Sequence, residues 1–259
     1  LKSQYPNDLN IPYISYYWGE YYLGMKEYEK AADQFQYLVQ MYPDSKIVRD
    51  AALGLAKSLD ALGYDEQAFQ IIDYIDKRWP RFYIEDLNFL LMSANTQNRL
   101  GKIGQARENY WAYYNLAPEA PEADIVLARI GDIYLKTGQK TAAKEIYEKA
   151  AKDFPDKEGG LVSMMRLAEE GIYDDPSMSQ MDKVFDRPYN LRPQKIYNHI
   201  IEKFPDSPLA PLAQLKLGMW YYWNKKYGDC LGAVQGFLDK YPRSGLRERA
   251  SELGTRVFD

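Results

Sequence analysis

The side chains that could perform acid–base or metal chemistry are few and poorly placed for it. The densest acidic group consists of Glu169-Glu170 and Asp174-Asp175. A metal ion needs oxygen ligands that converge at about 2.0–2.6 Å, whereas adjacent side chains diverge on a helix. Paired carboxylates for glycoside chemistry also need a cleft and a raised pKa. We therefore interpret these acids as the solvated end of a helix.

The sequence contains one cysteine, Cys230, and one histidine, His199. An intrachain disulfide is excluded, and a zinc site built from cysteines and histidines is out of reach. The sequence has no glycine-rich phosphate loop, no nucleophile elbow and no His-Glu metal helix. We therefore predict a chain that is not an enzyme and has no catalytic residues, no metal site and no cofactor.

Composition excludes several further classes of protein. Hydrophobic residues make up 46% of the 259 residues, which argues against intrinsic disorder. The net charge is −4 and no basic block is present, so we expect no nucleic-acid partner. No apolar run is long enough to cross a bilayer, so we expect no membrane insertion by this segment.

The most informative pattern is an aromatic residue followed by proline, which recurs along the whole chain. Successive prolines lie 37, 38, 37, 50 and 37 residues apart. A period of this length indicates stacked helical units. The pair stands at Tyr42-Pro43, Trp79-Pro80, Phe154-Pro155, Phe204-Pro205 and Tyr241-Pro242, with Ala117-Pro118 in the same slot.

Each unit has the pattern of two helices joined by a tight turn. In the second helix a small residue and a large one stand four positions apart, as in Ala31 and Phe35, and so share one helix face. The first helix carries its own small position, and proline ends the second helix. We expect Asp44-Ser45 to act as the N-cap of the next helix. The turn glycines, which can adopt a left-handed conformation, are Gly63, Gly101 and Gly138, with Lys26 and Lys225 in the same slot.

This order of small, aromatic, glycine, alanine, aromatic and proline residues resembles the tetratricopeptide repeat family over nearly the whole chain. The best match is the unit with Gly131, Tyr134, Gly138, Ala143, Tyr147, Ala150 and Pro155. The period exceeds the usual 34 residues, and the Tyr/Phe-Pro-Asp-Ser ending is similar to a longer bacterial form, as in the TolA-binding coordinator and the barrel-assembly lipoprotein. The resemblance implies an all-α fold: a right-handed superhelical solenoid of helix pairs with a C-terminal capping helix.

The expected unit boundaries follow from the repeated prolines. Residues 1–6 resemble the tail of a preceding repeat, so we expect the native chain to extend upstream. The fifth unit contains an insertion at about 174–191, which is either a loop that contacts a partner or a surface excursion. The units are 7–43, 44–80, 81–118, 119–155, 156–205 and 206–242, and residues 243–259 form the capping helix.

In this family the first helix of each pair lines a concave face, so the resemblance implies a binding groove. The lining mixes apolar side chains, both signs of charge and amides, which suits an extended peptide or a helix. Glu20 and Asp132 would repel a terminal carboxylate, so we do not expect chaperone tails to bind. The candidate partner-binding residues are Tyr16, Glu20, Lys57, Asn95, Asn98, Arg99, Asp132, Glu169, Tyr222 and Trp223.

Aromatic residues make up 15% of the chain, and most of them occupy core positions of the repeat. The aromatic residues that the repeat pattern does not explain are candidates for a partner surface. They leave open an alternative function as a cell-wall glycan-binding module. Our main hypothesis is a protein-interaction scaffold in a bacterial envelope assembly, periplasmic or envelope-associated, with a cytoplasmic location and the oligomeric state left open. The exceptions are Tyr16, Tyr17, Tyr113, Tyr114, Tyr222 and Trp223.

Overall fold

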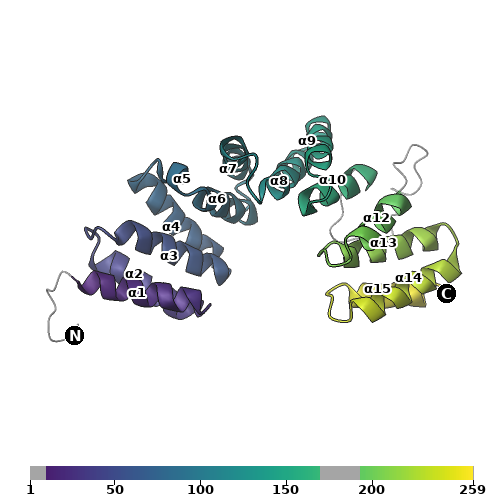
Figure 1. Ribbon diagram of the computed structural model, residues 1–259, viewed down its shortest axis with the longest axis horizontal. Coiled ribbons are helices and arrows are strands. Elements are labelled where there is room, and N and C mark those ends of the chain that lie inside the picture. Colours follow the sequence, from purple (N-terminus) through teal and green to yellow (C-terminus); the bar gives the residue numbers. More distant parts are fainter. Residues whose placement is uncertain (1–9, 170–192, 259) are drawn as a thin grey trace. The chain divides into compact units, whose positions relative to one another are not determined.

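The computed structural model describes residues 10–169 and 193–258. All regular secondary structure in these two ranges is helical. Consecutive helices pack against one another as antiparallel pairs joined by short turns (Figure 1). The predicted all-α class of paired helices is therefore confirmed. The expected repeat tail at 1–6 and the insertion at about 174–191 lie outside the described residues, as do Glu170, Asp174 and Asp175.

The chain divides into two compact units, residues 1–118 and 119–259. In unit 1 the helices pair as α1 with α2, α3 with α4, and α6 with α7, and α2 also packs on α3. A single turn, α5, precedes α6 and was not predicted. The bounds are α1 (Ile11–Gly24), α2 (Tyr28–Met41), α3 (Val48–Ala61), α4 (Asp65–Arg78), α5 (Phe82–Glu85), α6 (Leu87–Arg99) and α7 (Ile103–Leu116).

Unit 2 repeats the same arrangement and ends with an added helix. The repeat pairs are α8 with α9, α10 with α12, and α13 with α14; α10 also packs on α8 and α9, and α12 also packs on α13. Helix α15 packs on α14 and α13, which is the place of the predicted capping helix. The bounds are α8 (Ala123–Lys136), α9 (Lys140–Asp153), α10 (Glu158–Glu169), α12 (Pro193–Lys203), α13 (Ala210–Trp223), α14 (Tyr227–Lys240) and α15 (Arg247–Thr255).

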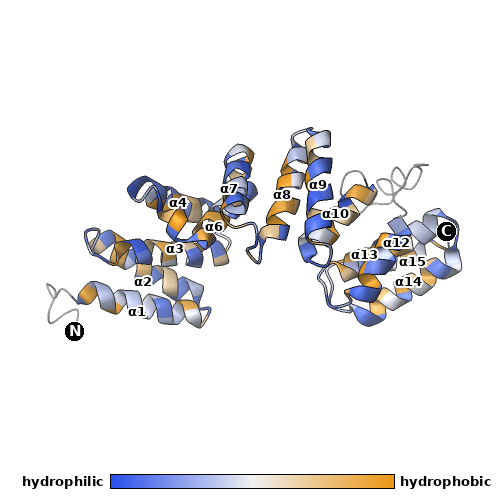
Figure 2. Cartoon of the chain, turned by 45° about the horizontal axis from the view of Figure 1, so that its top comes forward, coloured by the Kyte–Doolittle hydropathy of each residue, from blue (hydrophilic) through white to orange (hydrophobic). Residues whose placement is uncertain are grey.

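Hydropathy follows position in the stack. Helix α8 is largely hydrophobic and α9 largely hydrophilic (Figure 2). The reason is packing, because α8 contacts both α9 and α10 and buries eight of its residues, whereas α9 buries only Ala143, Tyr147 and Ala150. A helix with neighbours on two sides needs a wider apolar surface than one with a solvent-facing side.

The turns between paired helices adopt the expected left-handed conformation. Gly63, Gly101 and Gly138 have φ angles of +75°, +72° and +79°. In the first and last pairs the same slot is held by Lys26 and Lys225, with φ angles of +60° and +58°. A lysine there has a Cβ atom close to the following carbonyl, which costs roughly 1–2 kcal/mol.

Small residues on three of the first helices lie against aromatic rings of an adjacent second helix. A Cβ atom added to Gly19 or to Gly54 would lie 2.5 Å from the ring of Phe35. A Cβ atom on Gly131 would lie 2.4 Å from the ring of Tyr147. Phe35 is fully buried between α1 and α3, so it joins two consecutive repeats.

The predicted N-caps are wrong. Helix α3 begins at Val48 with Ile47 as its N-cap residue, which makes no side-chain cap. Ser45 instead accepts a hydrogen bond from the backbone N–H of Ile47 at 3.4 Å, inside the turn. Ser207 and Ser244 accept in the same way from the N–H groups of Leu209 and Leu246, both at 3.2 Å, so the serines after three of the prolines stabilise the turn that precedes the helix.

A close backbone contact that sequence reasoning missed fixes the start of α10. The backbone N–H of Gly159 donates to the buried carboxylate of Asp124 at 2.8 Å. A Cβ atom on Gly160 would lie 1.8 Å from the carbonyl oxygen of Phe154. Only glycine fits there, because the neighbouring atoms belong to backbone that cannot move aside.

Candidate functional site

The predicted lining residues of unit 1 lie on α1, α3 and α6, the first helices of their pairs. Tyr16 is half-buried with its ring 6.0 Å from that of Phe35, and burial followed by the charge of Glu20 raises the pKa of its hydroxyl. Glu20 and Lys57 are exposed, and within the described chain neither forms an ion pair. These two side chains remain available to a partner.

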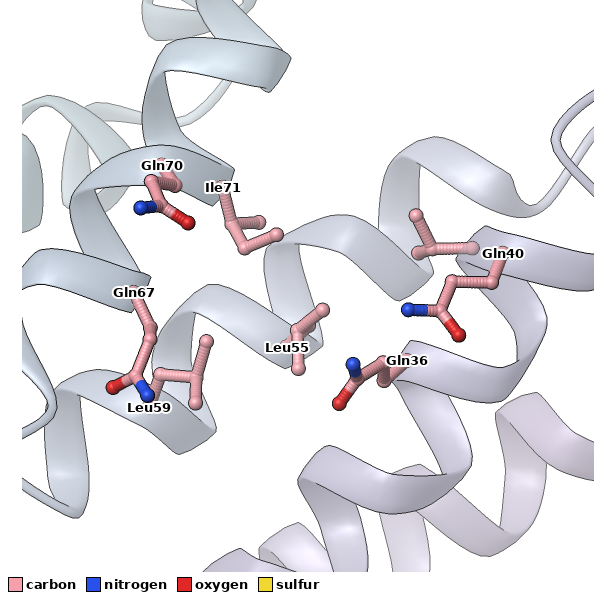
Figure 3. A pocket seen from close by; sticks show the side chains of 8 residues that line it. Gln36, Gln40, Leu55, Leu59, Gln67, Gln70 and Ile71 are labelled. Carbon is pink, nitrogen blue, oxygen red and sulfur yellow. The ribbon is translucent and has the colours of Figure 1, made fainter.

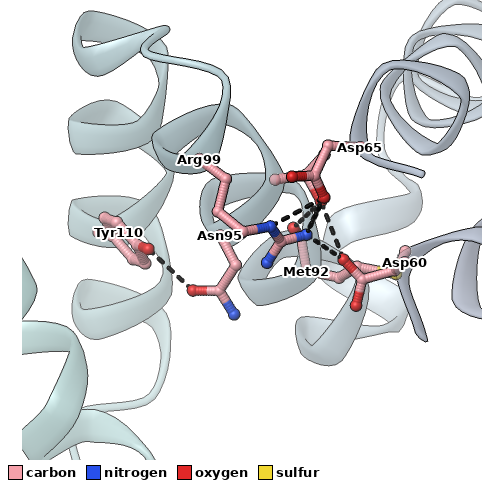
Figure 4. A network of polar contacts seen from close by, with 7 residues as sticks. Asp60, Asp65, Met92, Asn95, Arg99 and Tyr110 are labelled. Atoms are coloured by element: carbon pink, nitrogen blue, oxygen red, sulfur yellow. Dashed lines mark hydrogen bonds and ion pairs between the residues drawn. The ribbon is translucent and has the colours of Figure 1, made fainter. Parts of the chain in front are cut away.

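The polar residues of α6 are mostly used to join repeats (Figure 4). Arg99 forms ion pairs with Asp60 of α3 and with Asp65 of α4, the latter at 2.9 Å. Asn95 accepts a hydrogen bond from the hydroxyl of Tyr110 on α7 at 2.8 Å. Arg99 and Asn95 therefore have internal partners that a peptide would have to compete with.

Asn98 differs from its neighbours on α6. Its side-chain oxygen is buried, and no hydrogen-bond donor within the described residues reaches it. An unpaired buried carbonyl oxygen typically costs about 1–3 kcal/mol. Because this oxygen is buried in the chain itself, its lack of a donor does not indicate a peptide contact, and Asn98 remains a candidate only by its position on α6.

In unit 2 the predicted lining acids form internal bridges of one recurring kind. Asp132 on α8 accepts a hydrogen bond from the hydroxyl of Tyr147 at 2.7 Å and pairs with Arg166 of α10, Nε to Oδ1, at 3.1 Å. Each bridge links a tyrosine of a second helix, an acid of its first helix, and a cation of the following first helix. The acids thus connect successive repeats.

Glu169 makes the same bridge in a fully buried form. It accepts from the hydroxyl of Tyr197 at 2.8 Å and pairs with Lys216 at 2.6 Å. The side chains of Glu169 and Lys216 are 0% and 1% exposed. Burial, followed by the charge of Glu169, raises the pKa of Tyr197. The expectation that Glu169 contacts a partner does not fit this burial, because removing a buried carboxylate from its cation is strongly unfavourable.

The aromatic candidates are less exposed than the sequence indicated. Tyr222 and Trp223 are half-buried and pack against the core of unit 2, and the ring of Tyr222 lies 5.8 Å from that of Tyr227. Tyr113 is only 2% exposed and belongs to the core. Apart from Phe258 near the end of the described chain (80%), the most exposed aromatic residues in the described ranges are instead Tyr17 (66%), Tyr21 (55%) and Trp18 (50%), all on α1.

Unit 1 also contains a pocket that sequence reasoning missed. It has a volume of about 220 Å³ and lies between α2 and α4, with α3 behind it (Figure 3). Aliphatic side chains form its inner surface, and four exposed glutamines surround them. The glutamines occur as same-face pairs three or four residues apart, which is the signal that could have revealed them. The lining residues are Gln36, Val39, Gln40, Leu55, Leu59, Gln67, Gln70 and Ile71.

The reactive side chains have structural surroundings. Cys230 is buried, which raises the pKa of its thiol to about 11 and leaves it protonated at neutral pH. The imidazole ring of His199 packs edge-on against Phe204 at 5.6 Å. Across residues 10–169 and 193–258, no three potential metal ligands cluster, and no helix has the length and apolar character needed to span a bilayer.

Comparison with known proteins agrees with the helix pairs. The family model "Tetratricopeptide repeat" matches residues 13–45 and 126–157. Among solved structures, a tetratricopeptide repeat protein from Parabacteroides merdae ATCC 43184 aligns with a TM-score of 0.61 at 11% identity, covering 96% of this chain and all of that one. The APC/C hetero-tetramer Cut9-Hcn1 aligns at 0.54 and 16% identity, covering 93% of this chain and 41% of that one.

These structural similarities, at such low identity, concern the fold alone. A search of curated proteins finds no significant sequence match. The family match, the left-handed glycine turns and the rings set against small residues all describe the same repeat. The chain therefore contains matches to the tetratricopeptide repeat at residues 13–45 and 126–157, within helix pairs that have the fold of a solved tetratricopeptide repeat protein.

Proposed function

We propose that this chain is a protein-interaction scaffold that binds a peptide or helix of another protein. Stacked helix pairs of this kind are typical of non-catalytic scaffolds, since they offer extended surfaces and no enclosed reaction site. The buried thiol and the internally paired acids of the described residues fit that use.

The pocket of unit 1 is the observation that carries the proposal. The amides of Gln36, Gln40, Gln67 and Gln70 make no hydrogen bond within the described part of the chain. An amide side chain both donates and accepts, as a peptide group does. An extended peptide could place one aliphatic side chain against Leu55 while these amides bind its backbone.

The predicted groove along the first helices is the alternative position for the same ligand. Lys57 and Glu20 are exposed there, and Asn98 is half-buried on the neighbouring helix α6. A peptide on this surface would depend on these three residues, whereas a peptide in the pocket would depend on the glutamines. The two positions therefore predict different sensitive substitutions.

Peptide display on the purified chain, followed by affinity measurement on the selected peptide, tests the proposal. We expect Gln36→Ala with Gln67→Ala to weaken binding at least tenfold. Gln105→Ala is the matched control, because it removes an exposed glutamine of α7 outside the pocket. Loss of binding in Lys57→Ala with Asn98→Ala instead would place the peptide in the groove. Failure to select any specific peptide would count against the function itself.

We further propose that the partner belongs to a bacterial envelope assembly, on the basis of the resemblance to the longer bacterial repeat. Fractionation of native cells tests this, and recovery of the protein in the periplasmic or envelope fraction is the expected result. A glycan-binding module has weaker support, because Tyr222 and Trp223 present only part of their rings to solvent. Binding to protein-free peptidoglycan that fails in Tyr222→Ala with Trp223→Ala would favour it.

A further inference from the structure

The pocket of unit 1 lies between two helices that run in the same direction, so its two ends can be compared. Helices α2 and α4 are the second helices of successive pairs. Gln36 and Gln67 lie toward one end of the pocket, and Gln40 and Gln70 lie toward the other (Figure 3). We refer to these as the N-terminal end and the C-terminal end of the pocket, because they lie nearer those ends of both helices.

A cation crosses the C-terminal end of the pocket. Arg78 lies two turns beyond Ile71 on the same face of α4. Its guanidinium group donates to the carbonyl oxygen of Pro43, which follows α2, at 2.9 Å and to the hydroxyl of Tyr74 at 2.8 Å. Asp44, the acid next to Pro43, pairs with Arg78 itself at 3.8 Å. A cationic residue of a ligand would therefore meet an arginine here and an acid that is already paired.

Acids without partners occupy the opposite, N-terminal end. Asp33 and Glu29 precede Gln36 by one and two turns along the same side of α2. Glu66 precedes Gln70 by one turn on α4. All three acids are exposed, and within residues 10–169 and 193–258 none of them forms an ion pair or a side-chain hydrogen bond. The two ends of the pocket therefore differ in charge.

The lysines of these two helices do not neutralise the acidic end. Lys30 of α2 pairs with Glu27 and lies over the ring of Tyr22 on α1, at 5.4 Å from its centroid. Lys77 of α4 pairs with Asp73, one turn before it, at 2.6 Å. Both ammonium groups are therefore held by other residues, and the negative charge of the N-terminal end is left for a ligand to meet.

The needs of the helices themselves do not explain all of these acids. A helix dipole favours acids in the first turn, and its effect fades beyond that turn. This accounts for Glu29 and Glu66, whereas Asp33 lies in the second turn of α2. At the repeat spacing of 37 residues, Asp33 corresponds to Gln70, and Gln36 corresponds to Asp73. Acid and amide exchange places between the two helices, so the repeat does not require an acid at Asp33.

We propose that the peptide bound in the pocket carries a lysine or arginine residue on the side of its aliphatic anchor that faces the N-terminal end. This inference rests on the proposed function and adds the sign and the place of a charge in the partner. A helix rises about 1.5 Å per residue, so Asp33 and Glu29 lie about 8 and 14 Å along α2 from the point midway between Gln36 and Gln40. An extended peptide spans about 3.3–3.6 Å per residue, which places the basic residue about two to four residues from the anchor.

Peptides selected by display on the full chain, synthesised with a fluorescein label for anisotropy, test this inference. We expect the binders to share an aliphatic residue with a lysine or arginine two to four residues to one side. Because exposed charges attract weakly and are screened by salt, binding is measured at low ionic strength. Glu29→Lys with Asp33→Lys should weaken binding at least tenfold. Glu145→Lys with Glu148→Lys on α9 is the matched control, because it makes the same change in net charge at exposed residues of the other unit.

A charge swap separates electrostatic attraction from damage to the pocket. A copy of the selected peptide with glutamate in place of its basic residue should bind the native chain at least tenfold more weakly than the original. The same copy should bind the chain with Glu29→Lys and Asp33→Lys more tightly than it binds the native chain. Asp33→Asn, which should weaken binding of the original peptide about threefold, provides a second variant if the double variant does not fold.

The outcomes distinguish this inference from the proposed function. Peptides that lose binding in Gln36→Ala with Gln67→Ala, but lack a basic residue or tolerate the charge reversal, would overturn the inference and leave the function standing. Selection of no specific peptide would overturn both. Peptides that depend instead on Lys57 and Asn98 would place the ligand outside the pocket and overturn the inference. Self-association of the chain that is lost in Gln36→Ala with Gln67→Ala would assign the pocket to a second copy and overturn it too.

Discussion

Phe35 is held between two glycines, and replacing Gly54 with alanine tests how tightly the first two repeats pack. The new methyl carbon would lie 2.5 Å from the Cζ atom of Phe35. Carbon atoms normally approach to about 3.5–4.0 Å, so the overlap is about 1 Å. The ring cannot retreat, because Gly19 on its other side is just as close. Helices α1 and α3 would have to move apart.

The expected cost is the difference between two opposing effects. Overpacking a core costs about 1–3 kcal/mol. Alanine gains about 0.5–1 kcal/mol over glycine inside a helix. Gly54→Ala should therefore lower the free energy of unfolding by about 1–2 kcal/mol. Gly232→Ala in α14, whose Cβ atom would meet nothing within 4 Å, should raise it by the propensity gain alone.

Urea unfolding followed by far-UV circular dichroism measures both variants. The gap between Gly54→Ala and Gly232→Ala isolates the overpacking cost, because the propensity gain is common to both. Phe35→Leu in the Gly54→Ala background should recover part of the loss, since the two sites are in contact. If Gly54→Ala stabilises the protein as much as Gly232→Ala does, the tight packing of Phe35 described above is refuted.

Three further predictions concern the buried ion pair of Lys216 and Glu169, the left-handed turns, and the half-buried Asp76. Lys216→Met leaves Glu169 buried without its cation and should lower the free energy of unfolding, measured in urea, by about 3–5 kcal/mol. Adding Glu169→Leu should restore most of this loss, and equal stability of the single and the double variant would contradict the prediction. Gly63→Ala should lower the free energy of unfolding by about 1 kcal/mol, whereas Lys225→Gly should not lower it, because both residues have a positive φ angle that favours glycine. A melting temperature that is higher for Gly63→Ala than for Lys225→Gly would contradict this prediction. Burial raises the pKa of the Asp76 carboxyl to about 6 in the folded state, against about 3.9 in the unfolded state. The folded state therefore binds more protons between these two values, and the stability that this carboxyl contributes at low pH is lost as the pH rises through about 6. The urea midpoint of Asp76→Asn should therefore exceed that of the native chain by more at pH 7 than at pH 4.5, and an equal difference at both pH values would count against the raised pKa.

The sequence alone determined the helix pairs and their turns, because the signals behind them are local. A proline such as Pro43 ends its helix whatever lies around it, since it lacks an N–H group. Gly63 reports a left-handed turn because few other residues adopt one without strain. The spacing of Ala31 and Phe35 defines a helix face within a single segment. Signals of this kind survive without knowledge of the neighbouring repeats.

Only the tertiary structure decided which polar residues are free to bind. Glu169 and Arg99 have the same types and positions as surface groove residues, yet each is paired with a residue 34 or more positions away in the sequence. The glutamines of the pocket are brought together from two helices, and Trp18 is exposed only because nothing in the described chain covers it. Burial and pairing depend on what the next helix places opposite, and periodicity within one helix does not contain that information.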